Sequence, residues 1–361
     1  MKVMCMYLPQ FHSFPENDEW WGKDYTEWVA VKGAKPLFPG HDQPRVPLDE
    51  KYYDLDKEAV ATLAHQADLA KKYGVYGFAI YQYYFNGKTL MERPLRALLE
   101  HPEIDINYNI CWANETWTRT WYGLSDQVLI AQEYGDRNDW RKYFEYLLPF
   151  FKDKRYIKVE NRPVWQIYKT FDIPCFAEMA GAMNEWAKEE GFDGLYIISG
   201  RTAAGSDDRG IADAYYYFEP GYTLKYDLPL SGKIAYNLGT LARSIRNRLV
   251  GAGRGNILER RVNGKMVMNA IAKRDYADNE FPGIIPDWDN TPRRGYKGLV
   301  YTGTSPELFK ETLKVLRQKV EGHAADFVYI NAWNEWGEGA FIEPDRTRGY
   351  AYLEAVNEAN S

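Results

Sequence analysis

Strand-like and helix-like segments alternate along almost the whole chain, and this rhythm constrains the fold more than any other feature. Eight apolar stretches rich in aromatic and β-branched residues predict strands. These stretches cover residues 2–8, 75–84, 106–114, 163–169, 195–200, 213–219, 282–290 and 327–336. Helical periodicity is clearest in residues 55–74, 172–191 and 305–322, and each of these segments ends on a glycine, a common helix stop.

Eight strands alternating with helices predict a single (β/α)8 barrel of the TIM type that covers residues 1–361. No proline- or serine-rich linker and no internal repeat interrupts the pattern. An open doubly wound sheet is the alternative. Its glycine-rich phosphate fingerprint is missing after the first strand, where PQFHSFPEN follows instead.

The composition is that of an acidic chain with a large share of aromatic residues. Phenylalanine, tryptophan and tyrosine make up 16% of the chain, and its net charge is −6. The acidic balance argues against a nucleic-acid partner, whereas aromatic platforms suit the apolar faces of a carbohydrate. The three cysteines and five histidines are scattered, so we expect no metal site and no cofactor.

Nothing in the sequence predicts insertion into a membrane. No apolar run approaches the length that spans a bilayer. The start MKVMCMYLPQF resembles a first strand rather than a signal peptide, so we expect a cytoplasmic location. Peripheral contact with a membrane and the oligomeric state stay open.

Residues 243–274 depart from the rhythm because they are strongly basic. We expect an insertion or an outer helix here, either as a solvated face or as a surface for an anionic glycan or a lipid-linked phosphate. Glu259 is the only acidic residue in this stretch. The basic residues are Arg243, Arg246, Arg248, Arg254, Arg260, Arg261, Lys265, Lys273 and Arg274.

Aromatic, amide and carboxylate side chains gather where the predicted strands end. In a parallel barrel the reacting groups lie at these C-terminal ends, so the pattern predicts a polar pocket suited to a carbohydrate. The predicted substrate contacts are Tyr7, Gln10, Tyr81, Tyr83, Trp112, Asn114, Glu115, Trp117, Tyr168, Trp288, Asn334 and Trp336.

The stretch NAWNEWGEGAFIEP at residues 331–344 places two carboxylates, Glu335 and Glu338, three residues apart. Alternation along FVYINAWNE places Glu335 on the face that points into the barrel mouth, and a turn at Gly337 would bring Glu338 near it. Two close carboxylates rarely ionise together, so one pKa should rise, as an acid/base pair requires. Glycoside hydrolysis uses such a pair.

Other interpretations of these carboxylates stay open. The pair could be held in salt bridges by an arginine. Glu115 could supply an acid from across the barrel, although contact with sugar hydroxyls is the preferred role. The candidate arginines are Arg293, Arg294, Arg346 and Arg348.

Four separated motifs resemble the WbsX-like family, the glycoside hydrolase family 99-like domains of bacterial polysaccharide gene clusters. The motifs are YLPQFHSFPENDEWWGKDYTEW (7–28), CWANETWTRTW (111–121), PDWDNTPRR (286–294) and NAWNEWGEGAFIEPD (331–345). The more distant family 99 endo-α-mannosidases imply a (β/α)8 barrel and retaining cleavage. By this resemblance Glu335 would be the base that assists the sugar 2-hydroxyl, and Glu338 the acid that protonates the leaving oxygen.

The resemblance favours a retaining glycoside hydrolase that acts on α-linked, mannose-like bonds of a bacterial surface polysaccharide or its precursor. A glycosyltransferase or transglycosylase of capsule or O-antigen synthesis is the alternative, and a catalytically silent sugar-binding barrel is a third. The DWD stretch at 287–289 has the spacing of a metal-binding Asp-x-Asp. We expect it instead to be a strand end that contacts sugar.

Overall fold

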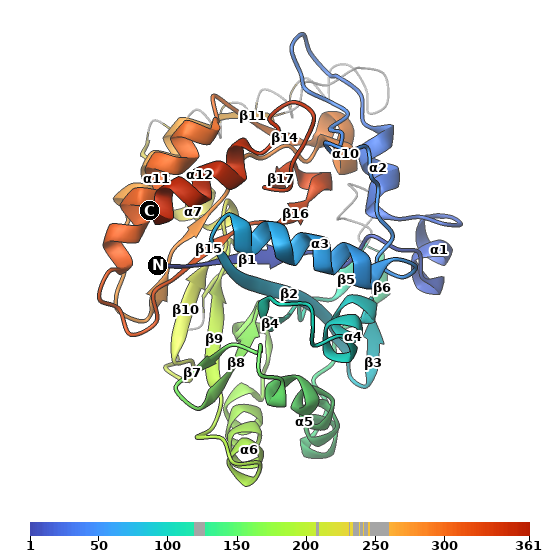
Figure 1. Cartoon of the computed structure of the whole chain (residues 1–361), viewed down its shortest axis with the longest axis vertical. Helices are drawn as coiled ribbons and strands as arrows, with labels where there is room; N and C mark the ends of the chain where they lie inside the picture. Colours follow the sequence, from blue (N-terminus) through green and yellow to red (C-terminus); the bar gives the residue numbers. More distant parts are fainter. Residues whose placement is uncertain are drawn as a thin grey trace.

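The computed structural model describes residues 1–118, 127–206, 209–230, 232–233, 238, 241, 245 and 260–361. Parallel strands form its centre, and Figure 1 shows them enclosed by helices. In spatial order the segments are β12 (Glu280–Phe281), β10 (Ala214–Tyr217), β9 (Tyr196–Arg201), β8 (Arg162–Ile167), β4 (Asn107–Trp112), β2 (Val75–Phe85), β1 (Lys2–Tyr7), β15 (Phe327–Ile330) and β13 (Gly283–Ile284).

The two segments at the ends of this order are neighbours in the chain, separated only by Pro282. Segment β12 pairs with β10 on one side, and β13 pairs with β15 on the other. The Pro282 carbonyl still accepts a hydrogen bond from the Tyr329 N–H at 2.8 Å. Counted as one strand interrupted by a proline, β12 and β13 therefore close an eight-stranded parallel barrel. The predicted TIM-type fold class is confirmed, although this strand ends well before the predicted residue 290.

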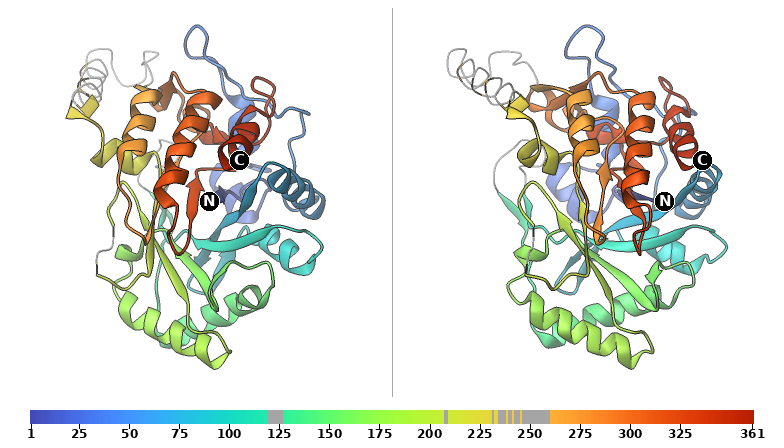
Figure 2. Two further views of the ribbon diagram at one scale, coloured as in Figure 1. Left: turned by 60° about the vertical axis from the view of Figure 1, so that its left-hand side comes forward. Right: turned by 90° about the vertical axis from the view of Figure 1, so that its left-hand side faces the viewer.

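Helices cover the outside of the barrel, and α5 and α6 lie side by side in all three views (Figure 1; Figure 2). Asp136 and Asp139 form a capping box that starts α5, and the Ser305 side chain caps α11 ahead of a proline. The covering helices are α3 (Ala59–Lys72), α4 (Arg93–Glu100), α5 (Arg137–Lys152), α6 (Phe176–Glu189), α7 (Gly221–Tyr226), α9 (Gly264–Lys273), α11 (Pro306–Val320) and α12 (Ala351–Asn360). Among the described residues, every helix is too short or too polar to span a bilayer.

Side-chain alternation along the strands decides what reaches the inside of the barrel. In β2, Tyr81 and Tyr83 point inward and line a cavity. Gln82 and Tyr84 point outward to α5, where Tyr143 donates a hydrogen bond to Gln82 at 2.7 Å and stacks on Tyr84 at 4.3 Å. Each strand thus divides its side chains between the barrel interior and the helical shell.

Several short elements lie at the C-terminal mouth of the barrel, whereas β7 pairs with the start of β8 at the opposite end. At the mouth α2 and α10 lie side by side (Figure 1), and η4 packs against both. The short helices and 3-10 turns are α1 (Pro15–Trp21), α2 (Glu27–Gly33), α10 (Thr291–Arg294), η2 (Thr170–Asp172), η3 (Gly295–Lys297) and η4 (Trp336–Glu338). The short strands are β3 (Lys88–Leu90), β5 (Trp117–Thr118), β6 (Val128–Ile130), β7 (Lys158–Val159), β11 (Arg260–Asn263), β14 (Leu299–Thr302), β16 (Asn334–Glu335) and β17 (Ala340–Phe341).

The basic stretch 243–274 is only partly described. Its first four arginines lie outside the described residues. The remainder forms strand β11, which pairs with β14, and the outer helix α9. Arg274 is not a solvated charge, because its guanidinium pairs with the buried carboxylate of Glu219 at 2.9 Å. Part of this stretch therefore forms a strand of a separate two-stranded sheet and one of the helices that cover the barrel.

Candidate active site

A cavity of about 280 Å³ opens at the C-terminal mouth of the barrel. Residues from β2 and from the segments that follow β1, β4, β8, β10, β13 and β15 form its wall. The lining residues are Leu8, Gln10, Tyr81, Tyr83, Ala113, Glu115, Tyr168, Phe218, Trp288, Asn290, Arg293, Arg294, Glu335 and Glu338. Eight of them were predicted as catalytic or substrate-binding residues, and the structure brings these eight together around one space.

Glu335 and Glu338 reach the cavity through a hairpin rather than along a continuous strand. Strand β15 ends at Ile330, and β16 then pairs antiparallel with β17, with η4 in the connection. The predicted strand 327–336 is therefore too long. The alternation argument places Glu335 correctly in the mouth, but the hairpin supplies the physical reason.

One arginine holds both predicted catalytic carboxylates. Arg293 Nη2 lies 2.9 Å from Glu335 Oε2, and Nη1 lies 2.8 Å from Glu338 Oε1. Its Nε donates to a third carboxylate, Glu27 Oε1, at 2.7 Å. The salt-bridge alternative is thus present in the geometry. It does not remove either side chain from the cavity wall, because Glu335 and Glu338 both line it.

Three carboxylates on one guanidinium leave an excess of negative charge in a buried place. The pKa of Glu335 is raised to about 8, chiefly by burial; the charge of Arg293 opposes this rise and the charge of Glu338 adds to it. Burial also raises the pKa of Glu338. Because both contact the same cation, protonation of one changes the field at the other. Both shifts favour a proton on the pair, and a retained proton is what general acid catalysis needs.

Gly337 allows this centre to assemble. A Cβ atom at this position would lie 1.6 Å from Glu27 Oε1 and 2.8 Å from Arg293 Nε. Gly337 is therefore required for close approach rather than for the turn that the sequence predicts. The left-handed residue is Gly339, whose φ is 63° and which ends η4.

The rest of the cavity combines aromatic rings with a few polar groups. Tyr81, Tyr83 and Tyr168 stay neutral, because burial raises the pKa of each well above its ordinary value. On the wall, Glu115 forms an ion pair with Lys169. Aromatic rings with hydroxyl groups, beside an ion pair, can hold a polyol through ring stacking and hydrogen bonds.

Tyr7 and Trp112 differ from the expectation because both point out of the barrel. The Tyr7 hydroxyl donates to Gln66 of α3 at 2.8 Å. Trp112 donates to the Tyr84 carbonyl at 3.1 Å and stacks on Trp165. Their neighbours along the strands point inward, so alternation alone accounts for the difference.

Asn114 and Trp117 lie beside the cavity without lining it. The Asn114 amide is tied to the backbone of Lys169, donating at 2.8 Å and accepting at 2.9 Å. The ring of Trp117 packs edge-on against Tyr83 and Phe85. Neither residue lines the cavity, although direct contact was expected. Both instead pack against or bond to residues that flank it.

Asn334 and Trp336 also support the site from outside the cavity. The Asn334 amide accepts from the Leu8 N–H at 2.8 Å and donates to the Leu8 carbonyl at 3.0 Å, which fixes the end of β1 to the hairpin. Trp336 stacks on Phe341 with ring centroids 3.7 Å apart and donates to Glu343 at 2.6 Å. Neither side chain lines the cavity, contrary to the expectation.

Glu343 is a further buried carboxylate that the sequence reasoning missed. It accepts hydrogen bonds from Trp333 and Gln66 on Oε1, at 3.0 and 2.7 Å, and from Trp336 and Tyr53 on Oε2, at 2.6 and 3.0 Å. Burial raises its pKa to about 7. It fixes both indoles of the hairpin segment and so positions the residues between them.

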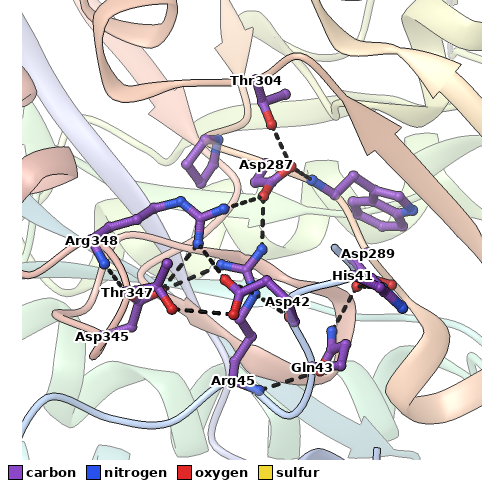
Figure 3. Close-up of polar contacts among 12 residues, drawn as sticks. His41, Asp42, Gln43, Arg45, Asp287, Asp289, Thr304, Asp345, Thr347 and Arg348 are labelled. Carbon is purple, nitrogen blue, oxygen red and sulfur yellow. Dashed lines mark hydrogen bonds and ion pairs between the residues drawn. The ribbon is translucent and has the colours of Figure 1, made fainter. Parts of the chain in front are cut away.

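A second charged network lies apart from the cavity and is drawn in Figure 3. Arg45 contacts Asp287 at 3.1 Å and Asp345 at 3.4 Å, and Arg348 contacts the same Asp287 oxygen at 3.2 Å. Asp42 joins through both arginines. These pairs connect three segments that lie far apart in the sequence.

The DWD stretch at 287–289 belongs largely to this network. Asp289 accepts from Gln43 at 2.6 Å and lies 2.7 Å from His41 Nε2, and these contacts lower its pKa (Figure 3). Only Trp288 lines the cavity. Asp287 and Asp289 are thus engaged in protein contacts, and within this stretch the predicted sugar contact stays a prediction for Trp288.

Arginine was the main omission among the predicted site residues. Arg293 and Arg294 entered the sequence reasoning only as candidates for neutralising the acidic pair, and Asn290, Phe218 and Glu27 did not enter it. The position of the TPRR segment directly after a strand end was an available signal, because such segments surround the mouth of a barrel.

The fold is shared with structurally characterised carbohydrate-active proteins. A glycoside hydrolase family 99 endo-α-mannosidase from Bacteroides thetaiotaomicron superposes with a TM-score of 0.54 and 12% identity over 99% of this chain and 96% of that chain. A structure described as a glycoside hydrolase-like protein superposes with a TM-score of 0.58 and 13% identity, over 99% and 93% of the two chains. At this identity the likeness shows the barrel fold alone.

The chain belongs to the WbsX family: the family model described as "Glycosyltransferase WbsX" matches residues 3–356. The resemblance drawn from the four motifs is thereby confirmed. Proteins described as "Uncharacterized protein WxcX" from two strains of Xanthomonas campestris pv. campestris are 35% and 34% identical over 362 aligned residues. The alignments cover 99% of this chain and 49% of each relative, so the chain spans about half the length of these relatives.

Proposed function

We propose that this chain is a retaining glycoside hydrolase that acts on α-linked, mannose-like bonds of a bacterial surface polysaccharide or its precursor. One observation carries the proposal. Glu335 and Glu338 share one arginine on the wall of an aromatic cavity, and burial raises the pKa of both. A pair that shares one proton supplies a base and an acid to a single bound sugar. Burial in the free protein favours that proton on Glu335, so the scheme requires it to reside on Glu338 once the sugar is bound, with Arg293 contacting both carboxylates.

The proposed reaction has two steps. In the first step, Glu335 takes the proton of the sugar 2-hydroxyl. The 2-oxygen of the sugar then attacks C1, and the C1–O bond to the leaving group breaks. Glu338 gives its proton to the leaving oxygen. In the second, Glu338 deprotonates a water that opens the anhydro ring at C1, and Glu335 returns its proton to the 2-oxygen. Two inversions at C1 retain the anomeric configuration.

Glycosyl transfer is the second candidate, and the description of the family favours it. The first step is unchanged, and an acceptor hydroxyl replaces water in the second. A transferase that uses a nucleotide sugar would instead release a nucleotide from the donor. Hydrolysis and transfer thus differ in the molecule that attacks C1 in the second step, which is water or an acceptor hydroxyl. Both use the same two carboxylates.

The deciding experiment incubates the protein with α-mannosides and with polysaccharide from the source organism, with and without nucleotide sugars. Anomeric NMR of the first-formed product should show retention, and a 2-deoxy analogue should not react. An inverted product would overturn the scheme and make Glu115 the next carboxylate to test. Turnover only in the presence of a nucleotide sugar would favour transfer.

A further inference from the structure

Arg293 and Arg294 are neighbours on α10 and line the same cavity, but their surroundings differ. Arg293 contacts three carboxylates. The half-buried guanidinium of Arg294 makes no hydrogen bond or ion pair with any residue that the structure describes, and its Nε is buried without a partner. A partly buried cation without a partner is unfavourable unless solvent or a ligand compensates it.

Arg294 lines the same cavity as Glu335 and Glu338. The charges of Arg294 and Glu338 act on each other. Arg260 of β11 adds positive charge near Arg294. The Nε1 atom of Trp288, on the same cavity wall, is a second buried donor without a hydrogen-bond partner in the described part of the chain. Arg294 and Trp288 thus place a positive charge and two buried donors that lack a partner among the described residues on the wall of the cavity that Glu338 also lines.

We propose that Arg294 binds an anionic oxygen group, a carboxylate or a phosphate, carried by the part of the substrate on the leaving-group side of the bond. The proposal rests on the proposed function, in which Glu338 protonates the leaving oxygen, so the group that departs lies on its side of the cavity. An arginine with a purely structural task would pair with a protein acceptor, as Arg293 does. Guanidinium geometry matches carboxylate and phosphate oxygens.

The test compares α-mannosyl disaccharides whose leaving sugar is glucose, glucuronic acid or glucose 6-phosphate. These three sugars carry a neutral group, a carboxylate and a phosphate at the same carbon. Wild-type kcat/KM should be at least about 10-fold higher for one or both anionic substrates, because a buried charge pair contributes more than a neutral hydrogen bond. The two anionic arms distinguish a uronate from a phosphate.

The variant Arg294→Met should lose this preference, so its kcat/KM should fall about 10-fold further on the anionic disaccharide than on the neutral one. Arg294→Lys should retain part of the preference, since it keeps the charge without the planar fork. Arg96→Met, which removes an exposed arginine of α4, is the matched control and should change nothing. Equal turnover of the three substrates by the wild type, or a preference kept by Arg294→Met, would overturn the proposal.

A binding measurement separates this proposal from the proposed function. Methyl glucuronide, glucose 6-phosphate and methyl glucoside are titrated into the wild type and Arg294→Met, with NMR detection. Anion binding that depends on Arg294, without cleavage of any disaccharide, would sink the hydrolase scheme and keep the anion site. Cleavage without any Arg294-dependent preference or binding would keep the hydrolase scheme and overturn the anion site.

Discussion

The centre around Arg293 and the network around Arg45 both bury carboxylates together with arginine. They differ in whether they face the cavity and in the number of carboxylates for each arginine. Arg293 faces three carboxylates on the wall of a cavity. In the other network two arginines share three aspartates away from that cavity (Figure 3). Burial raises a pKa in each, to about 8 for Glu335 and about 6 for Asp345.

A raised pKa therefore does not by itself mark a reaction centre. The network around Arg45 connects the segment near residue 45 to those near residues 287 and 345, and its oxygens are engaged by protein donors. The centre around Arg293 presents its acids to a space of sugar size. The comparison predicts that variants of the first centre alter chemistry and that variants of the second alter stability.

The largest effect is expected for Glu335→Gln. Loss of the base should lower kcat on the order of 10⁴-fold on every substrate. The amide oxygen can still accept from Arg293, so the melting temperature should hold or rise. Steady-state kinetics beside a thermal melt check both parts. Near-normal turnover by the purified variant would show that Glu335 is only a salt-bridge partner.

Arg45→Met should reverse this pattern. Its removal leaves Asp287 and Asp345 buried with one cation fewer, which costs about 3–5 kcal/mol of unfolding free energy. Urea unfolding measures the loss, and kcat of the folded protein at low temperature should stay within about 3-fold. Arg96→Met, in an exposed pair, should cost less than about 1 kcal/mol. A large loss of kcat without destabilisation would break the comparison.

Glu338→Gln should be intermediate and should depend on the substrate. With an ordinary sugar leaving group, turnover should fall about 10²- to 10³-fold because the acid is lost. An aryl glycoside with a very acidic leaving group needs no proton, so its cleavage should be largely retained in the first step. Pre-steady-state release of the phenol measures that step. Equal losses on both substrates would remove the acid role.

Gly337→Ala tests whether close approach assembles the Arg293 centre. The added methyl group would meet Glu27 and Arg293, so we expect a loss of about 1–3 kcal/mol in stability together with reduced activity. Gly33→Ala is the matched control, since no atom lies within 4 Å of a Cβ built there. Similar behaviour of the two variants would contradict the packing argument.

The sequence predicted the barrel because alternating strands and helices leave few other folds, and its strand ends predicted the cavity. Eight predicted residues line it, among them Tyr81, Tyr83 and Tyr168. Side-chain alternation along the strands would have excluded Tyr7 and Trp112 from the predicted substrate contacts, because their neighbours point inward. The hairpin after Ile330 and the capture of two carboxylates by Arg293 could not be predicted, because both depend on contacts between segments far apart in the chain.

The smallest expected effect is on pH dependence, and it separates the two regions by which quantity responds: kcat/KM for the Arg293 centre and unfolding free energy for the network around Arg45. The pKa of Glu335 and that of Asp345 are both raised on folding, so each favours the folded state at low pH and loses that contribution as pH rises, through about 8 and about 6 respectively. Asp345→Asn should therefore flatten the fall in unfolding free energy between about pH 4 and 6. Only the Arg293 centre should shape kcat/KM, which we expect to fall above pH 8 as the shared proton is lost. Profiles of kcat/KM for the wild type and Asp345→Asn should superpose. A shifted profile in that variant would mean that the two networks are coupled electrostatically across the mouth of the barrel.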